Sequence, residues 1–189
     1  MLRRQIFAAA AVLPVAAIAS RAFAQDAAAA APAMGEAETT HVEQTGMVGA
    51  LSLMQSRIAL QNAENEQVQA FAQFEVTEQE TIADVLASMK AGAAEVSEQV
   101  VPPSDDELMA MIDADGQAKL TELQGLTGAE FDAAYVAANL EGHQQLLAIQ
   151  DEYLATGTNR EHVNVTKLAK GMITEHIAHL EALQMAIAG

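Results

Sequence analysis

The sequence predicts an all-α protein, a four-helix bundle with one long crossover that carries a shorter extra helix. Two observations predict it. Apolar residues recur at spacings of three and four through four long segments, which is the period of an α-helix and not of a strand. Four Ser/Thr-x-x-Glu motifs, which cap the first turn of a helix, precede such segments. They are Thr40 with Glu43, Ser104 with Glu107, Thr127 with Glu130, and Thr158 with Glu161.

Residues 1–24 are expected to be a removable export signal. They begin with Arg3 and Arg4, continue with the apolar run 7–18, and end in the small-x-small sequence Ala22-Phe23-Ala24. The apolar run is too short to span a bilayer, and no later run is long enough. We therefore expect a mature protein in the periplasm, without integral membrane association.

The charge of the chain limits its partners. Cleavage of the signal would remove three of the nine basic residues and none of the 26 acidic ones, so the formal charge would fall from −17 to −20. Such a surface repels nucleic acid and attracts cations. The chain has no cysteine, which excludes thiolate metal sites. No nucleophile elbow or phosphate loop is present, so the sequence does not indicate a hydrolase or a nucleotide enzyme.

The elements follow in order. Residues 25–39 are rich in alanine and are expected to be a flexible leader, and residues 40–189 to form the bundle. The predicted helices cover about 40–61, 65–91, 105–123 (the shorter one, after Pro102-Pro103), 128–155 and 159–187. Short turns join the long helices into two hairpins, and the segment between the hairpins crosses over. This is the connectivity of ferritin-like bundles.

Polar residues stand within the apolar stripes of three predicted helices. In 65–91, Glu75 and Gln79 lie near the centre of the stripe and Glu78 lies on its flank. In 128–155 the inward polar residues are Asp132, Asn139, His143 and Gln150. In 159–187 the stripe is Val165, Leu168, Met172, His176, His179, Leu183 and Ile187, which spans an arc of roughly 100°. A titratable side chain in such a position needs a buried partner.

The candidate metal ligands are Glu75, Glu78, His143, His176 and His179. Folding the last hairpin at Gly157 brings His143 within a turn of His176, at the level of the glutamates. Metal sites in the cores of helical bundles are formed by carboxylates and imidazoles from facing helices. Nitrogen and oxygen ligands favour zinc or iron, and manganese is also compatible with imidazole and carboxylate ligands. Copper would use methionines beside His176, although methionines at helical spacing usually fill the core.

The apolar stripe of the first predicted helix offers no central carboxylate to this site. Its stripe is Met47, Leu51, Met54 and Ile58, so we expect mainly apolar contacts from it and no symmetric dinuclear centre. We also place His162 on the outer face of the last helix. An alternative is a structural or interaction protein of the cell envelope, whose inward polar residues form a hydrogen-bonded network without metal. A third interpretation is an oxidase or a peroxide-detoxifying enzyme, which would need two metal ions.

Two segments, FDAAYVAANLEGH (131–143) and HIAHLEAL (176–183), resemble a large ferritin-like family of exported bacterial proteins. Its members are known mainly as a domain of unknown function. The family's Phe-Asp-x-x-Tyr run, the histidine that follows it, and the C-terminal histidine with leucine and alanine correspond to Phe131, Asp132, Tyr135, His143, His179, Leu180 and Ala182. The resemblance covers about residues 40–187 and implies a ferritin-like fold.

The chain departs from the family pattern at two places. The family's usual Asp-His pair is here Glu78-Gln79, and its usual glutamate in the first helix is missing near Gly49-Ala50. Both departures argue against a ferroxidase-type dinuclear centre.

Overall fold

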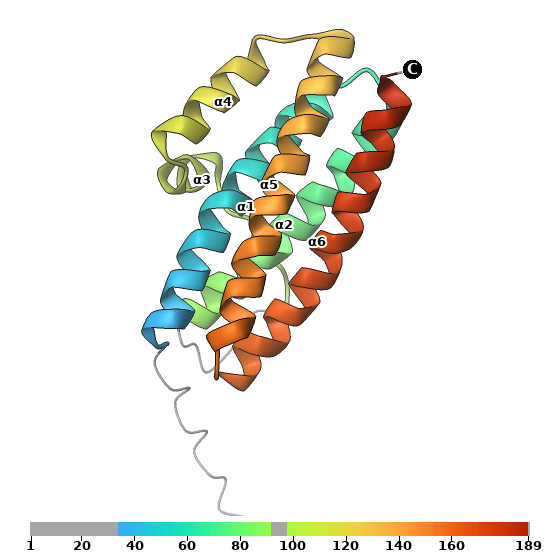
Figure 1. Cartoon of the computed structure of the whole chain (residues 1–189). Coiled ribbons are helices and arrows are strands. Elements are labelled where there is room, and N and C mark those ends of the chain that lie inside the picture. The colour runs from blue at the N-terminus through green and yellow to red at the C-terminus, as the bar shows by residue number, and fades with distance from the viewer. Residues whose placement is uncertain (1–33, 92–97, 189) are drawn as a thin grey trace, which may run out of the picture.

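The computed structural model describes residues 34–91 and 98–188, and within those ranges it contains six α-helices and no strand. They are α1 (Glu36–Asn62), α2 (Glu66–Ala91), α3 (Asp105–Met111), α4 (Ala114–Gln124), α5 (Gly128–Thr156) and α6 (Arg160–Ile187). The long helices α1, α2, α5 and α6 lie alongside one another, and the short α3 and α4 lie beside α1 (Figure 1). The predicted all-α bundle is confirmed. The expected export signal (1–24) lies outside the described residues.

The crossover contains two short helices where one was predicted over 105–123. The chain becomes extended at Ile112, whose side chain is buried beside Leu108 and Leu120. Asp113 then caps a new helix, because its Oδ1 accepts the backbone N–H of Gly116 at 2.8 Å. Burial of Ile112 and capping by Asp113 together stop one helix and start the next.

Two of the four predicted capping motifs stand at the observed helix starts. Ser104 and Glu107 form the reciprocal box, with Glu107 Oε2 accepting the Ser104 N–H at 2.8 Å. Thr127 is the residue before α5, but its side chain makes no capping hydrogen bond.

The other two capping predictions were wrong. Helix α1 begins at Glu36, so Thr40 lies inside it and residues 36–39 of the predicted leader are helical. The Glu38 carboxylate accepts the Gly35 N–H at 3.1 Å and satisfies this earlier start. Asn159 caps α6 in place of Thr158, because its Oδ1 accepts two backbone N–H groups of the first turn.

The buried face of α1 differs from the predicted one. Leu51, Met54 and Ile58 pack in one cluster with Leu53 of α1 and Leu108 of α3, on the side of α1 that faces the crossover helices. The face toward the other long helices instead carries buried polar residues, namely His41, Thr45, Ser52, Gln55 and Ser56. The expectation of mainly apolar contacts from this helix was therefore wrong. Its physical reason is that the crossover helices cover the apolar side of α1.

Helix α6 is rotated from its predicted orientation by roughly 65° at 100° per residue. Its buried residues are His162, Thr166, Ala169, Ile173, Leu180 and Leu183. Thr166 can be buried because its hydroxyl donates to the His162 carbonyl at 2.8 Å. Leu168 is consequently 71% exposed, and His162, which we placed on the outer face, is only 1% exposed.

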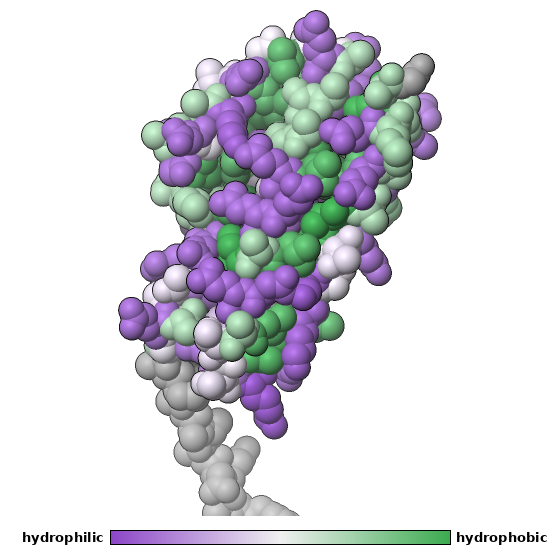
Figure 2. Space-filling view, viewed as in Figure 1, coloured by the Kyte–Doolittle hydropathy of each residue, from purple (hydrophilic) through white to green (hydrophobic). Residues whose placement is uncertain are grey.

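The face shown in Figure 2 carries hydrophilic residues over most of its area, with apolar patches between them. Among the described residues, no helix is both long enough and apolar enough to cross a membrane.

Asp132 ties the two hairpins together. It is buried at the start of α5, and its two carboxylate oxygens accept the backbone N–H groups of Glu64 and Asn65 at 3.2 and 2.9 Å. These groups lie in the α1–α2 turn and have no partner within a helix. The inward polar position predicted for Asp132 is thus confirmed, and its role is to fix this turn.

We expect Asp132→Asn to lower the free energy of unfolding by about 1–3 kcal/mol, because one amide oxygen cannot replace two charged acceptors in a buried site. Urea denaturation followed by circular dichroism measures the change. Asp151→Asn is the control, since Asp151 pairs with Lys170 on the surface and should matter by less than about 1 kcal/mol. Equal losses from both variants would contradict the proposed role of Asp132.

Candidate metal centre

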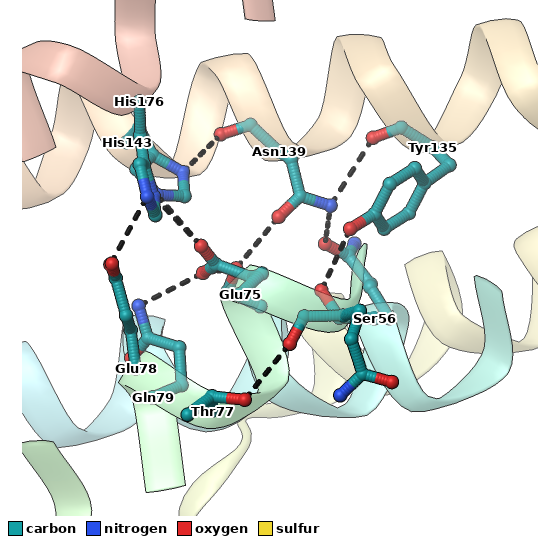
Figure 3. Close-up of polar contacts among 12 residues, drawn as sticks. Ser56, Glu75, Thr77, Glu78, Gln79, Tyr135, Asn139, His143 and His176 are labelled. Atoms are coloured by element: carbon teal, nitrogen blue, oxygen red, sulfur yellow. Dashed lines mark hydrogen bonds and ion pairs between the residues drawn. The ribbon is translucent and has the colours of Figure 1, made fainter. Parts of the chain in front are cut away.

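Three helices bring Glu75, His143 and His176 together in the middle of the bundle. Glu75 comes from α2, His143 from α5 and His176 from α6, and each offers one ligand atom within 4.8 Å of the others. Glu75 and His143 are 0% and 1% exposed. Figure 3 shows the Glu75 carboxylate pointing toward the two imidazole rings.

The two oxygens of Glu75 have different surroundings. Oε1 accepts hydrogen bonds from the Ser52 hydroxyl at 2.6 Å and from the Gln79 amide at 2.9 Å. Oε2 is buried without a hydrogen-bond partner among the described residues. It lies 3.3 Å from His143 Nε2 and 3.0 Å from His176 Nδ1, as close ion-pair contacts. One carboxylate oxygen is therefore anchored, and the other faces the histidines.

Contacts on the far side of each ring indicate which ring nitrogens carry protons. His143 Nδ1 lies 2.8 Å from the Asn139 carbonyl, and His176 Nε2 lies 3.1 Å from a Glu78 carboxylate oxygen. A carbonyl oxygen and a carboxylate oxygen accept hydrogen bonds, so the tautomers with the proton on these two ring nitrogens satisfy both contacts. In the neutral rings, His143 Nε2 and His176 Nδ1 then hold lone pairs. These two atoms face each other at 3.1 Å.

The site therefore gathers three lone-pair atoms, two nitrogens and one oxygen, with edges of 3.0, 3.1 and 3.3 Å. Such an arrangement is repulsive unless a cation lies among the atoms. Zinc bonds of 2.0–2.1 Å in a tetrahedron imply ligand atoms about 3.3 Å apart. The triangle thus has the size of one face of a tetrahedral metal site.

The charges around the site favour a cation. Burial opposes ionisation of Glu75, but the contacts with His143 and His176 outweigh it and hold the pKa of this carboxyl well below its usual range. Burial also opposes charging of His176, yet the Glu75 carboxylate raises the pKa of this histidine above its ordinary value. Without a metal ion, His176 Nδ1 is accordingly the place where a proton would sit.

Further polar contacts hold this group in place. Ser52 Oγ lies 2.7 Å from Asn139 Oδ1, and the Asn139 amide donates to the Tyr135 carbonyl at 3.2 Å. The Tyr135 hydroxyl is 2.8 Å from Ser56 Oγ (Figure 3). Burial raises the pKa of Tyr135, so its phenol stays neutral. The network links α1, α2 and α5 around the carboxylate.

The other two predicted ligands lie outside the triangle. Glu78 contacts the outer nitrogen of His176, and its side chain is 36% exposed. His179 is exposed, and its ring lies 5.5 Å from that of Phe71, centre to centre. The rotation of α6 explains this, because it turns His179 toward solvent while keeping His176 directed inward. Only three of the five candidates meet at one point.

The sequence interpretation missed Ser52 and the part that Gln79 plays in anchoring Glu75. A signal for Ser52 was present, because His41, Thr45, Ser52 and Ser56 follow the three-and-four spacing of one helix face. Small polar residues in such a row can be mistaken for a solvated face.

We expect Ser52→Ala to lower the free energy of unfolding by about 1–3 kcal/mol in metal-free buffer, because Glu75 Oε1 loses a buried donor. Urea denaturation measures this loss. Ser88→Ala is the matched control, since the Ser88 hydroxyl bonds only the Val85 carbonyl of its own helix, and it should cost far less. A loss no larger than that of the control would show that Ser52 does not anchor the carboxylate.

The comparisons with known proteins agree with part of the resemblance inferred from the sequence. The model of a family described as a domain of unknown function, DUF4142, matches residues 23–183. No curated protein and no solved structure matches the chain. Since the family match extends over most of the 189 residues, the chain belongs to the DUF4142 family.

Proposed function

We propose that this DUF4142 protein binds one divalent metal ion inside its helical bundle, through Glu75, His143 and His176. The observation that carries the proposal is the convergence of two imidazole nitrogens and one carboxylate oxygen at 3.0–3.3 Å. That oxygen is buried and has no hydrogen-bond partner among the described residues. A proton can occupy only part of this space, whereas a metal ion can contact all three atoms.

The ligand set favours zinc or iron. Two imidazoles and one carboxylate are the protein ligands of many zinc sites with an open position, and also of non-haem Fe(II) sites. Manganese prefers sites made only of oxygen ligands, so it suits this group less well. Copper is compatible with the two imidazoles. The chain has no cysteine, so no thiolate takes part in the group.

The outer partners support metal binding. Metal-bound histidines usually donate their second N–H to a carboxylate or a carbonyl, which fixes the ring and its tautomer. Glu78 and the Asn139 carbonyl take these two places. Glu78, which we first considered a ligand, is therefore assigned the role of orienting His176.

A single metal ion fits better than a pair. Two hairpins joined by a crossover match the connectivity of ferritin-like bundles, in which dinuclear sites use carboxylates from all four helices. In this chain Ser52 is the α1 residue that contacts Glu75, and it supplies a hydroxyl where a second metal ion would need a carboxylate. The described residues contain one group of three such ligands.

We further propose that the protein works outside the cytoplasm, on the basis of the signal-like residues 1–24 and the strongly acidic composition. An acidic surface raises the local concentration of cations. The competing function is that of a metal-free structural protein of the cell envelope, in which His176 keeps a proton.

Zinc or Fe(II) added to the metal-free protein should raise the thermal midpoint in a saturable way, because the ion binds the folded chain. At a hundredfold excess over the dissociation constant the gain would be about 2.7 kcal/mol. Elemental analysis of the purified protein should find close to one ion per chain. If zinc, iron, manganese and copper all leave the midpoint unchanged, the metal-free structural function is correct.

Matched variants separate the core site from binding at the acidic surface. His143→Ala and His176→Ala should abolish the metal-dependent gain, whereas His179→Ala, on the exposed side of α6, should retain it. Glu78→Gln should weaken affinity by about 10–100-fold, as expected for a partner of a ligand. A gain that survives in both core variants would place the metal ion elsewhere.

Metal affinity should decrease as the pH is lowered. His176 Nδ1 must lose its proton before it can bind a metal ion, and its pKa lies above the ordinary value of about 6.5. When the pH is lowered from 8, the affinity measured by calorimetry should therefore begin to decrease before pH 6.5 is reached, and it should decrease further below pH 6.5. An affinity that stays constant from pH 8 to 5.5 would exclude His176 as a ligand.

A further inference from the structure

A second group of buried polar residues lies at the other end of the bundle, where α1 begins and the α5–α6 hairpin turns. His41 of α1 and His162 of α6 are in contact, with His162 Nε2 2.8 Å from His41 Nδ1. Their rings also contact that of Tyr153, with centres 4.6 and 4.5 Å away. Both histidines are almost completely buried. The proposed metal centre uses neither of them.

The neighbouring amide fixes the protons of this pair. Gln150 Nε2 donates to Thr45 Oγ1 at 3.1 Å, so Gln150 Oε1 is free to accept from His41 Nε2 at 2.9 Å. His41 Nδ1 then holds a lone pair and accepts the N–H of His162 Nε2. The remaining nitrogen, His162 Nδ1, is buried without a hydrogen-bond partner among the described residues. The chain of bonds is complete only when both rings are neutral.

An added proton has two possible positions, and each disrupts the group. On His41 Nδ1 it would set two N–H groups against each other and break the bond between the rings. On His162 Nδ1 it would create a buried, charged N–H group without an acceptor. Burial accordingly lowers the pKa of both histidines.

Charged and titratable groups from all three helices face the pair. On α1, Glu38 attracts a proton on His162, but its oxygens are already engaged by the Tyr153 hydroxyl at 2.9 Å and the Gly35 N–H at 3.1 Å. On α5, Tyr153 stays neutral because burial raises its pKa. On α6, the facing group is His162 itself. Glu36 and Glu152 line a cavity of about 420 Å³ that reaches His41, so water and protons have access to it.

Few buried apolar side chains hold the start of α1. Among residues 36–45, Val42 is the one buried hydrophobic side chain, and the other buried residues are Glu38, His41 and Thr45. A segment with few apolar contacts opens at a low free-energy cost.

We propose that the His41–His162 pair is an acid-sensitive latch, which holds the start of α1 against the α5–α6 hairpin at neutral pH and releases it on protonation. The sign follows from linkage, because the opened form binds protons more readily than the closed one. The latch is fully closed above the ordinary histidine pKa of about 6.5, and the closed state loses stability as the pH falls below that value.

Amide hydrogen exchange of the full chain, in buffer with a chelator so that metal binding does not contribute, tests the latch. Exchange rates are divided by the intrinsic rate at each pH. Between pH 7.5 and 5.5, protection of residues 41–45 should fall by about tenfold for each histidine that gains a proton on opening. Protection in the middle of α2, residues 71–82, should fall less. A uniform loss over both segments, or no loss in 41–45, would overturn the proposal.

Variants assign the effect to the pair. In His162→Gln the glutamine amide can still donate to His41, but one titrating ring is removed. The loss of protection in residues 41–45 between pH 7.5 and 5.5 should therefore be about tenfold smaller than in the unmodified chain. His179→Gln, which removes an exposed histidine from the same helix, should leave it unchanged. If the His162 variant does not fold, the unmodified chain provides the test by histidine NMR. The proposal requires the two rings to titrate over the same pH range in which protection of residues 41–45 is lost. Titration of both rings without that loss would contradict the latch.

Discussion

The carboxylate of Glu75 is the constraint on which the bundle depends. A buried carboxylate destabilises a core by several kcal/mol unless partners surround it. Each long helix supplies one, namely Ser52 from α1, Gln79 from α2, His143 from α5 and His176 from α6. These contacts join all four long helices at one level, and the same carboxylate is part of the candidate metal centre.

The two histidine pairs show how hydrogen bonding decides the chemistry of similar residues. In the candidate metal centre, the Glu78 carboxylate and the Asn139 carbonyl lie beside the outer ring nitrogens, and in the neutral rings this leaves two lone pairs facing each other. In the second pair, one ring donates to the other. The first arrangement could hold a cation, whereas in the second the facing lone pair already accepts a hydrogen bond. Their expected responses to acid differ for the same reason, since a proton can occupy the first site and disrupts the second.

The crossover has a structural part in this chemistry. Helices α3 and α4 cover the apolar side of α1 with Leu108, Ile112 and Leu120. Because that side is covered, the opposite face of α1 is free to carry the hydroxyl of Ser52 toward Glu75. A bundle of four helices alone would expose the apolar side of α1, and its inner face would have to be apolar as well.

The sequence by itself determined the four long helices, the two hairpins, and the inward position of Glu75 and His143, because the period of apolar residues reports which side chains share a face. It did not determine how each face is rotated against its neighbours. Only the tertiary structure decided that His162 is buried, that His179 is exposed and that Ser52 faces the carboxylate. The physical reason is that a buried polar residue is identified by its hydrogen-bond partners, and these lie on other helices, far away along the chain.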